Sequence, residues 1–196
     1  MILYYLELII LAFIQGVTEF IPVSSSAHLI LISKISNFNL SSLEIDVSLH
    51  LGSLLAIIFY FWKDLININL NKALLNLILI GSIPLIILGF ILFKYNLIYL
   101  LRDLKIIAWT TLTFAILLYF SDKKSSFKTI NKNLSTKNII WIGIFQGLAI
   151  IPGVSRSGIV ITACRFLKFK REEAAKISFF LSIPALLGAS TLSLGD

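Results

Sequence analysis

Hydrophobic residues fill six long blocks of this chain, and short polar segments separate the blocks. The blocks lie at about 2–32, 47–62, 73–93, 106–120, 139–164 and 177–194. Blocks of this length and apolarity predict helices embedded in a membrane. Pro22 interrupts the first block, and Pro152 with Gly153 interrupts the fifth. Non-helical backbone at membrane depth is tolerated only where protein or a water-filled cavity satisfies it, so both interruptions predict re-entrant segments.

The two interrupted blocks resemble each other in sequence. A shift of 131 positions superposes five identical residues. These pairs are Gln15 with Gln146, Gly16 with Gly147, Val23 with Val154, Ser24 with Ser155, and Ser26 with Ser157. Paired interruptions in two halves are typical of inverted-repeat membrane folds with a site near the bilayer midplane. We therefore predict an all-α polytopic membrane protein, an inverted-repeat helical bundle whose two broken re-entrant helices meet near the midplane. It forms a single integral membrane domain over 1–196, with halves at about 1–120 and 138–196.

Composition and charge support this interpretation. Of the 196 residues, 58% are hydrophobic and 14% charged, and the mean hydropathy of +0.94 leaves too few polar residues to cover a soluble domain. The net charge of +7 comes from short loops rather than from a basic face with aromatics, so nucleic acid is not an expected partner. The basic segments 122–137 and 165–176 are expected in the cytoplasm. Both flank the block 139–164, which therefore should enter the membrane and return on the same side.

Two smaller features complete the description of the chain. The first apolar run has no basic region before it and no small-residue cleavage site, so we expect it to be retained as a helix rather than removed as a signal peptide. Cys164 is the only cysteine and is interpreted as a small apolar packing residue.

The first interruption carries polar groups that are costly inside a membrane. Gln15 and Glu19 are four residues apart, so on a helix they share a face and can offer two oxygens to a hard cation. After Pro22, the run 24–26 consists of three serines that can cap a new helix and form an anion cradle with its free N–H groups. His28 follows one turn later on the same face, within reach of a phosphoryl group. The alternatives are simple helix capping for the serines and a structural ion pair for Glu19.

The second interruption offers a cation instead of a carboxylate. Arg156 stands between two serines in a glycine-containing turn. Its planar fork suits a phosphate, or Glu19 could be its partner. The alternative, an arginine that extends to the membrane surface, is disfavoured by the apolar runs on both sides. Asp46 and His50, also four apart, could support the site, although we favour the interpretation that they are interfacial residues.

The two motifs, Gln15 to His28 and Pro152 to Gly158, closely resemble the signatures of the undecaprenyl-diphosphate phosphatase family, the bacitracin-resistance proteins. The likeness also covers the segments 49–56 and 179–189. It implies a hydrolase that converts undecaprenyl diphosphate to undecaprenyl phosphate and inorganic phosphate, recycling the lipid carrier for peptidoglycan synthesis. It further implies a divalent cation, Mg²⁺ or Ca²⁺, and a multi-pass protein of the bacterial cytoplasmic membrane whose active site faces the extracytoplasmic side.

The resemblance also implies roles for individual residues. Catalytic roles fall to Glu19, Ser25, His28 and Arg156, with Ser25 or a water as the nucleophile and His28 as acid or base. The residues expected to bind the substrate phosphates are Ser24, Ser26, Gly153, Ser155 and Ser157. Glu19 and Gln15 are the expected metal-site residues.

The chain departs from the family pattern in three ways. Ala27 replaces a usual glycine, and Gln15 is the uncharged one of two permitted residues, which lowers the negative charge at the cation site. Family members continue beyond the position of Asp196, so their closing helices are expected to be missing. The rival function is a polyprenyl-phosphate flippase or anion transporter on the same inverted-repeat plan. The expected partners are the lipid substrate and the bilayer, and a homodimer is left open.

Overall fold

The structure is a computed structural model that describes residues 2–36, 38, 43–97 and 99–193. Within these residues every regular element is a helix, which confirms the all-helical prediction. In chain order they are α1 (Ile2–Thr18), α2 (Ser25–Ile35), α3 (Leu43–Tyr60), α4 (Trp62–Leu70), α5 (Lys72–Lys94), η1 (Tyr99–Arg102), α6 (Leu104–Asp122), α7 (Ile130–Asn133), α8 (Thr136–Gly147), η2 (Leu148–Ile150), α9 (Arg156–Phe166) and α10 (Arg171–Ser193).

The helices follow the six apolar blocks closely. The first block splits at its interruption into α1 and α2, and the fifth splits into α8 and α9, as the prolines predict. Helices α4 and α7 form in segments where the sequence predicted no element, and residues 194–196 at the end of the last block lie outside the described part. α5 and α6 are long and apolar enough to cross a membrane, and little of either is buried within the protein. This is a membrane protein with apolar helices on its periphery.

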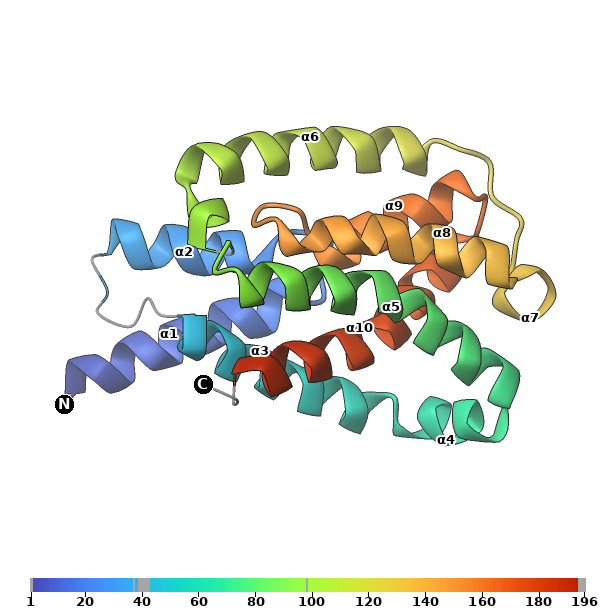
Figure 1. Ribbon diagram of the computed structural model, residues 1–196, viewed down its shortest axis with the longest axis horizontal. Coiled ribbons are helices and arrows are strands. Elements are labelled where there is room, and N and C mark those ends of the chain that lie inside the picture. Colours follow the sequence, from blue (N-terminus) through green and yellow to red (C-terminus); the bar gives the residue numbers. More distant parts are fainter. Residues whose placement is uncertain (1, 37, 39–42, 98, 194–196) are drawn as a thin grey trace.

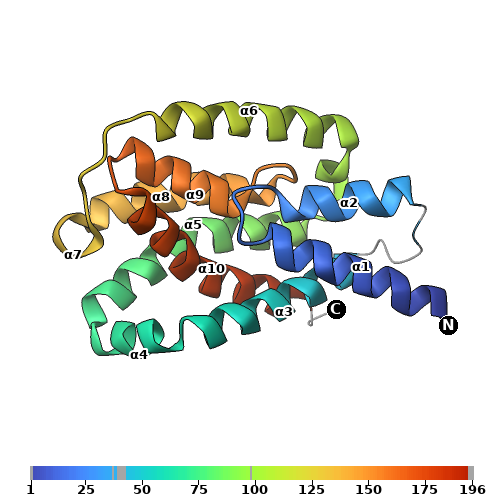
Figure 2. The same ribbon diagram turned by 180° about the vertical axis from the view of Figure 1, so that it is seen from behind.

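Two helical hairpins enter the molecule from opposite ends. In Figure 1 the pair α1 and α2 comes from the left and the pair α8 and α9 from the right, and the turns of both hairpins meet near the centre. The view from behind shows the same arrangement (Figure 2). α3, α5 and α10 run beside the meeting point, and α6 covers α9. The candidate site residues therefore lie in the middle of the bundle, far from both ends.

The hairpin of α8 and α9 is held by close packing on α5. A side chain at Gly143 would collide with the backbone of Gly81, so α8 and α5 approach to backbone contact there. Small residues allow such approach between membrane helices. The surrounding core is aliphatic and fully buried at Ile142, Val160 and Leu181. A rigid frame thus positions the second turn.

Both open ends of this hairpin lie at one end of the bundle, where the chain is strongly basic. The buried guanidinium of Arg165 donates to the carbonyl oxygens of Phe169 (2.9 Å), Asp122 (2.8 Å) and Lys124 (3.0 Å). Asp122 also accepts two hydrogen bonds from Arg171. The segment after α6 and the turn between α9 and α10 are therefore tied together, as a hairpin with both flanks on one side requires.

Candidate active site

The first turn places Glu19 directly after the end of α1. The Glu19 N–H still donates to the Gln15 carbonyl, after which the chain turns through residues 19–23. Ser24 then caps α2, because its hydroxyl accepts the N–H of Ala27 at 3.3 Å. The predicted cap is confirmed. The break leaves a carboxylate and the first serines of a new helix side by side.

The second turn repeats this local structure. Ser155 caps α9 by accepting the N–H of Gly158 at 3.1 Å. Its hydroxyl lies 3.2 Å from that of Ser157, and Ser24 lies 3.2 Å from Ser26 in the first turn. The two pairs of serines that match under the 131-residue shift therefore also match in local hydrogen bonding.

Gly153 makes the second turn possible. Its φ of +92° lies in a region that residues with a side chain rarely adopt. A Cβ atom there would strike the Thr110 hydroxyl and come within 2.7 Å of the Ile107 carbonyl oxygen. Two α6 hydroxyls hold the turn, since Thr110 donates to the Pro152 carbonyl (2.7 Å) and Thr111 to that of Gly153 (3.3 Å). No sequence motif pointed to these threonines.

The two turns interlock through polar contacts. The Gly153 N–H donates to the Ser24 hydroxyl at 3.2 Å, and the Ser157 hydroxyl donates to the Ile21 carbonyl at 3.2 Å. Gly153, predicted to bind phosphate, thus uses its N–H to join the two turns. Each turn completes hydrogen bonds that the other leaves open, so the site exists only where both meet.

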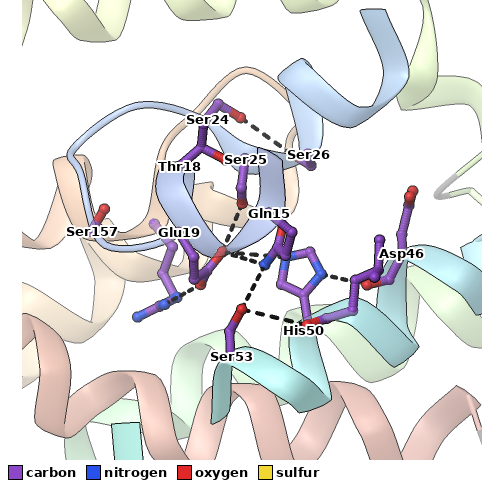
Figure 3. Close-up of polar contacts among 12 residues, drawn as sticks. Gln15, Thr18, Glu19, Ser24, Ser25, Ser26, Asp46, His50, Ser53 and Ser157 are labelled. Atoms are coloured by element: carbon purple, nitrogen blue, oxygen red, sulfur yellow. Dashed lines mark hydrogen bonds and ion pairs between the residues drawn. The ribbon is translucent and has the colours of Figure 1, made fainter. Parts of the chain in front are cut away.

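Glu19 is the centre of the resulting cluster, with 6% of its surface exposed. One carboxylate oxygen, Oε1, forms an ion pair with the Arg156 guanidinium. The other, Oε2, accepts hydrogen bonds from the Ser25 hydroxyl (2.7 Å) and the Gln15 amide (3.0 Å). His50 Nε2 lies 3.5 Å from the same oxygen. Figure 3 shows these side chains converging from α1, α2 and α3.

His50 and Ser53 of α3 also belong to this cluster; the sequence offered a supporting role for His50 only as the alternative interpretation and gave no indication of Ser53. The His50 ring donates from Nδ1 to the Asp46 carbonyl oxygen at 2.6 Å, which directs Nε2 toward Glu19. Ser53 accepts from the Gln15 amide at 3.3 Å. The interfacial interpretation of His50 therefore gives way to the alternative of a supporting role. The spacing of Asp46 and His50 was the one signal that could have indicated it.

His28 is not brought to the cluster. Its ring lies on the exposed side of α2, where Nδ1 donates to the Ser24 carbonyl at 2.7 Å. The predicted position on the face of the serines does not bring this imidazole to the Ser25 hydroxyl, because Ser25 donates to Glu19 instead. His28 also does not line the cavity beside the cluster.

A cavity of about 280 Å³ opens beside the cluster. Its polar wall comes from both turns and from the start of α3, and includes Glu19, Arg156 and five serine hydroxyls. Those serines are Ser24, Ser25, Ser26, Ser155 and Ser157. Its other wall is apolar and comes from α5 and α10, at Leu85, Ile86, Phe93, Ala185 and Leu186. Such a space suits an anionic headgroup attached to an apolar chain.

Comparison with known proteins agrees with this arrangement. The family model described as bacitracin resistance protein BacA matches residues 8–196. An undecaprenyl-diphosphatase of Pelagibacter ubique is 55% identical over 190 residues, which are 96% of this chain and 74% of that protein. Proteins of the same name from Alcanivorax borkumensis and from a Ruegeria species are 42% and 37% identical, with 98% and 95% of this chain covered and 77% and 75% of theirs. The chain spans about three quarters of the length of these relatives. With nearly its whole length matched and its two turns joined at Glu19 and Arg156, the chain belongs to the bacitracin resistance protein BacA family.

Proposed function

We propose that this protein is a membrane phosphatase that hydrolyses undecaprenyl diphosphate to undecaprenyl phosphate and inorganic phosphate. The names of its relatives support the substrate. The observation that carries the proposal is the joining of Arg156 and Glu19, from opposite hairpins, at the polar wall of a cavity whose other wall is apolar. A prenyl diphosphate has the matching division into charged head and apolar chain.

Arg156 binds the terminal phosphoryl group in this proposal. Phosphoryl transfer concentrates negative charge on the equatorial and leaving oxygens, so positioned cations contribute most of the catalysis. In the free protein, the Arg156 guanidinium is held by Glu19 and by the Ser178 carbonyl at 3.4 Å. These two partners hold the planar guanidinium group of Arg156 at a position where a phosphate can accept two hydrogen bonds from it. The serine hydroxyls of the two caps complete the cradle.

Ser25 is our choice for the nucleophile, with Glu19 as its base. The hydroxyl already donates to Glu19 Oε2 at 2.7 Å, which is the geometry of an activated nucleophile. Attack of Ser25 Oγ on the terminal phosphorus forms one P–O bond and breaks the bond to the bridging oxygen, and the Ser25 proton passes to Glu19. Undecaprenyl phosphate leaves with the bridging oxygen. Water then releases inorganic phosphate and restores the serine, with Glu19 returning the proton to its hydroxyl.

A divalent cation fits the residues beside the nucleophile. Gln15 Oε1 is buried and has no hydrogen-bond partner among the described residues, and it belongs to a side chain bonded to Glu19. Within the described part of the chain, no three acidic, histidine or cysteine side chains converge, so phosphate oxygens of the substrate would complete the ligand shell. Glu19 and Gln15 would hold Mg²⁺ or Ca²⁺, which supplies charge neutralisation on the phosphates when bound.

The charge distribution supports the placement in the membrane that we propose. We assign the basic end of the bundle, with segments 122–137 and 165–176, to the cytoplasm. The hairpins are then two re-entrant segments of an inverted repeat, their turns meet near the midplane of the bacterial cytoplasmic membrane, and the cavity opens toward the extracytoplasmic side. Its lining residues at the start of α3 and in η1 support this direction, since α6 runs from η1 to the basic end.

The test is phosphate release from a prenyl diphosphate by the purified protein in detergent. We expect release that stops with a chelator and returns with Mg²⁺. Glu19→Gln should lower the rate at least a hundredfold, since it removes both the base and the partner of Arg156. Glu172→Gln, at an exposed acidic residue of α10, is the matched control and should keep full activity. A folded wild-type protein that releases no phosphate with either cation present would refute the proposal.

A further inference from the structure

A second ion pair lines the same cavity. Arg102, the last residue of η1, donates from Nη2 to Asp46 Oδ2 at 2.8 Å, and both side chains lie on the cavity wall. The Asp46 side chain is 9% exposed and that of Arg102 is 19% exposed. An ion pair so shielded is costly to assemble, and well-packed apolar residues would stabilise the protein equally well. Stability alone therefore does not account for it.

The pair lies on the far side of His50 from Glu19. Asp46 and His50 are one helical turn apart in α3, and the Asp46 carbonyl accepts the hydrogen bond from the His50 ring. Figure 3 shows the Asp46 carboxylate pointing away from Glu19. The cavity thus has two charged pairs in sequence along its polar wall, Glu19 with Arg156 and Asp46 with Arg102.

The second ion pair contributes to the net charge of the cavity wall. Among the described residues that line the cavity, the carboxylates are Glu19 and Asp46 and the guanidinium groups are Arg102 and Arg156. Two negative and two positive charges cancel, so removing Arg102 would leave a net negative cavity. A diphosphate monoester carries several negative charges, and such a cavity would repel it. Arg102 supplies half of the positive side-chain charge on the cavity wall.

We propose that Arg102 binds the phosphate that remains attached to the lipid, while Arg156 binds the phosphate that is released. This assignment rests on the proposed function. Asp46 holds Arg102 in place through one guanidinium nitrogen, the one that bonds within the described residues, and the other N–H groups of the guanidinium can donate to a phosphate in the cavity. Asp46 is then the counter-ion of Arg102 in the absence of substrate, and Arg102 makes the contact with the phosphate that stays on the lipid.

Two substitutions separate this role from a structural one, because both break the same ion pair but only one removes the cation. Arg102→Gln should raise KM for a short-chain prenyl diphosphate about tenfold, the equivalent of one charge-assisted hydrogen bond, with kcat changed less than about threefold. Asp46→Asn frees Arg102 and removes a negative charge, so it should not raise KM. Arg102→Lys should give an intermediate KM. Lys176→Gln breaks the ion pair with Asp64 (3.0 Å), whose residues do not line this cavity, and should leave KM unchanged.

Equilibrium binding of the two products gives a second measurement that does not depend on turnover. Calorimetry should show the Kd of a prenyl monophosphate rising about tenfold in Arg102→Gln, while the Kd of inorganic phosphate stays as in the wild type. An equal rise of KM in Asp46→Asn, or an unchanged prenyl monophosphate affinity in Arg102→Gln, would overturn the assignment. Absence of phosphate release by the wild type would instead refute the proposed function, and the binding comparison would still decide the role of Arg102.

Discussion

Replacing Arg156 by lysine keeps the positive charge but removes the planar guanidinium group with its two terminal nitrogens. In the structure Arg156 uses one terminal nitrogen for Glu19 and the other for the Ser178 carbonyl. A lysine ammonium keeps the charge beside Glu19 but loses the second contact, which at 3.4 Å contributes at most about 1 kcal/mol to stability. The folded protein should therefore survive with little loss.

Activity should respond quite differently. Lysine lacks the second N–H donor of the arginine guanidinium, which we assign to the transferred phosphoryl group. Removing one such preorganised donor typically lowers kcat by about 10²–10³, which raises the activation free energy by about 2.7–4 kcal/mol. Phosphate release per folded molecule, measured beside thermal unfolding in the same detergent, tests the difference.

Arg165→Lys provides the matched comparison, since Arg165 belongs to the same helix but donates to three backbone carbonyls at the basic end. It should lose about 1.5–4.5 kcal/mol of stability, from three hydrogen bonds of about 0.5–1.5 kcal/mol each, with normal turnover of the folded fraction. Retention of more than about a tenth of the wild-type kcat/KM by Arg156→Lys, a loss below 1.4 kcal/mol, would refute the assignment of Arg156 to the phosphate.

Three further predictions concern the two turns and their surroundings. Ser25→Ala should lower kcat at least a hundredfold with normal folded yield, whereas Ser24→Ala should lower yield and rate together through a lost cap of about 1 kcal/mol; near-normal turnover in Ser25→Ala would assign attack to water. Gly153→Ala should destabilise the protein by about 2–4 kcal/mol, measured by thermal unfolding, because positive φ and contact with α6 both oppose a side chain; an unchanged midpoint would contradict the turn geometry. Cysteines placed at Ser126 and Lys170 should react with a membrane-impermeant label from the same, cytoplasmic side, and labelling from opposite sides would exclude the hairpin topology.

Local signals in the sequence were sufficient for both turns. Proline breaks and serine caps depend on neighbours within a few positions, and the five-residue internal match marks the same two places. The end of α1, the start of α2, the end of α8 and the start of α9 could therefore be predicted. The pairing of Glu19 with Arg156 was one of two options left open, because only costly intramembrane charges indicated it. Local reasoning placed His28 on the face of the serines, but its ring donates to the Ser24 carbonyl on the exposed side of α2, while the Ser25 hydroxyl donates to Glu19.

The contribution of η1 could not be predicted, and that of α3 was indicated only by the spacing of Asp46 and His50. Glu19 and His50 are far apart in the sequence, and their contact depends on how α3 is rotated as it packs against α1 and α10. The apolar residues of α3 show little helical periodicity, and only the spacing of Asp46 and His50, which places them on one face, indicates which face is turned inward. Arg102 lies in a short connection with no motif, and only tertiary structure shows that it reaches Asp46. Long-range packing decides what short-range patterns leave undetermined.

The interlocked turns have a consequence for the order of events during synthesis. Glu19 and Arg156 are separated by 137 positions. At about 5–20 residues per second, a ribosome needs roughly 7–27 s to cover that distance. During this interval the newly made first hairpin holds an acidic group whose cationic partner has not yet been translated, in surroundings that disfavour charge. Until Arg156 is translated, the Glu19 carboxyl must therefore be protonated, exposed to water or bound by a chaperone. The ion pair can form only after the second hairpin has been inserted beside the first.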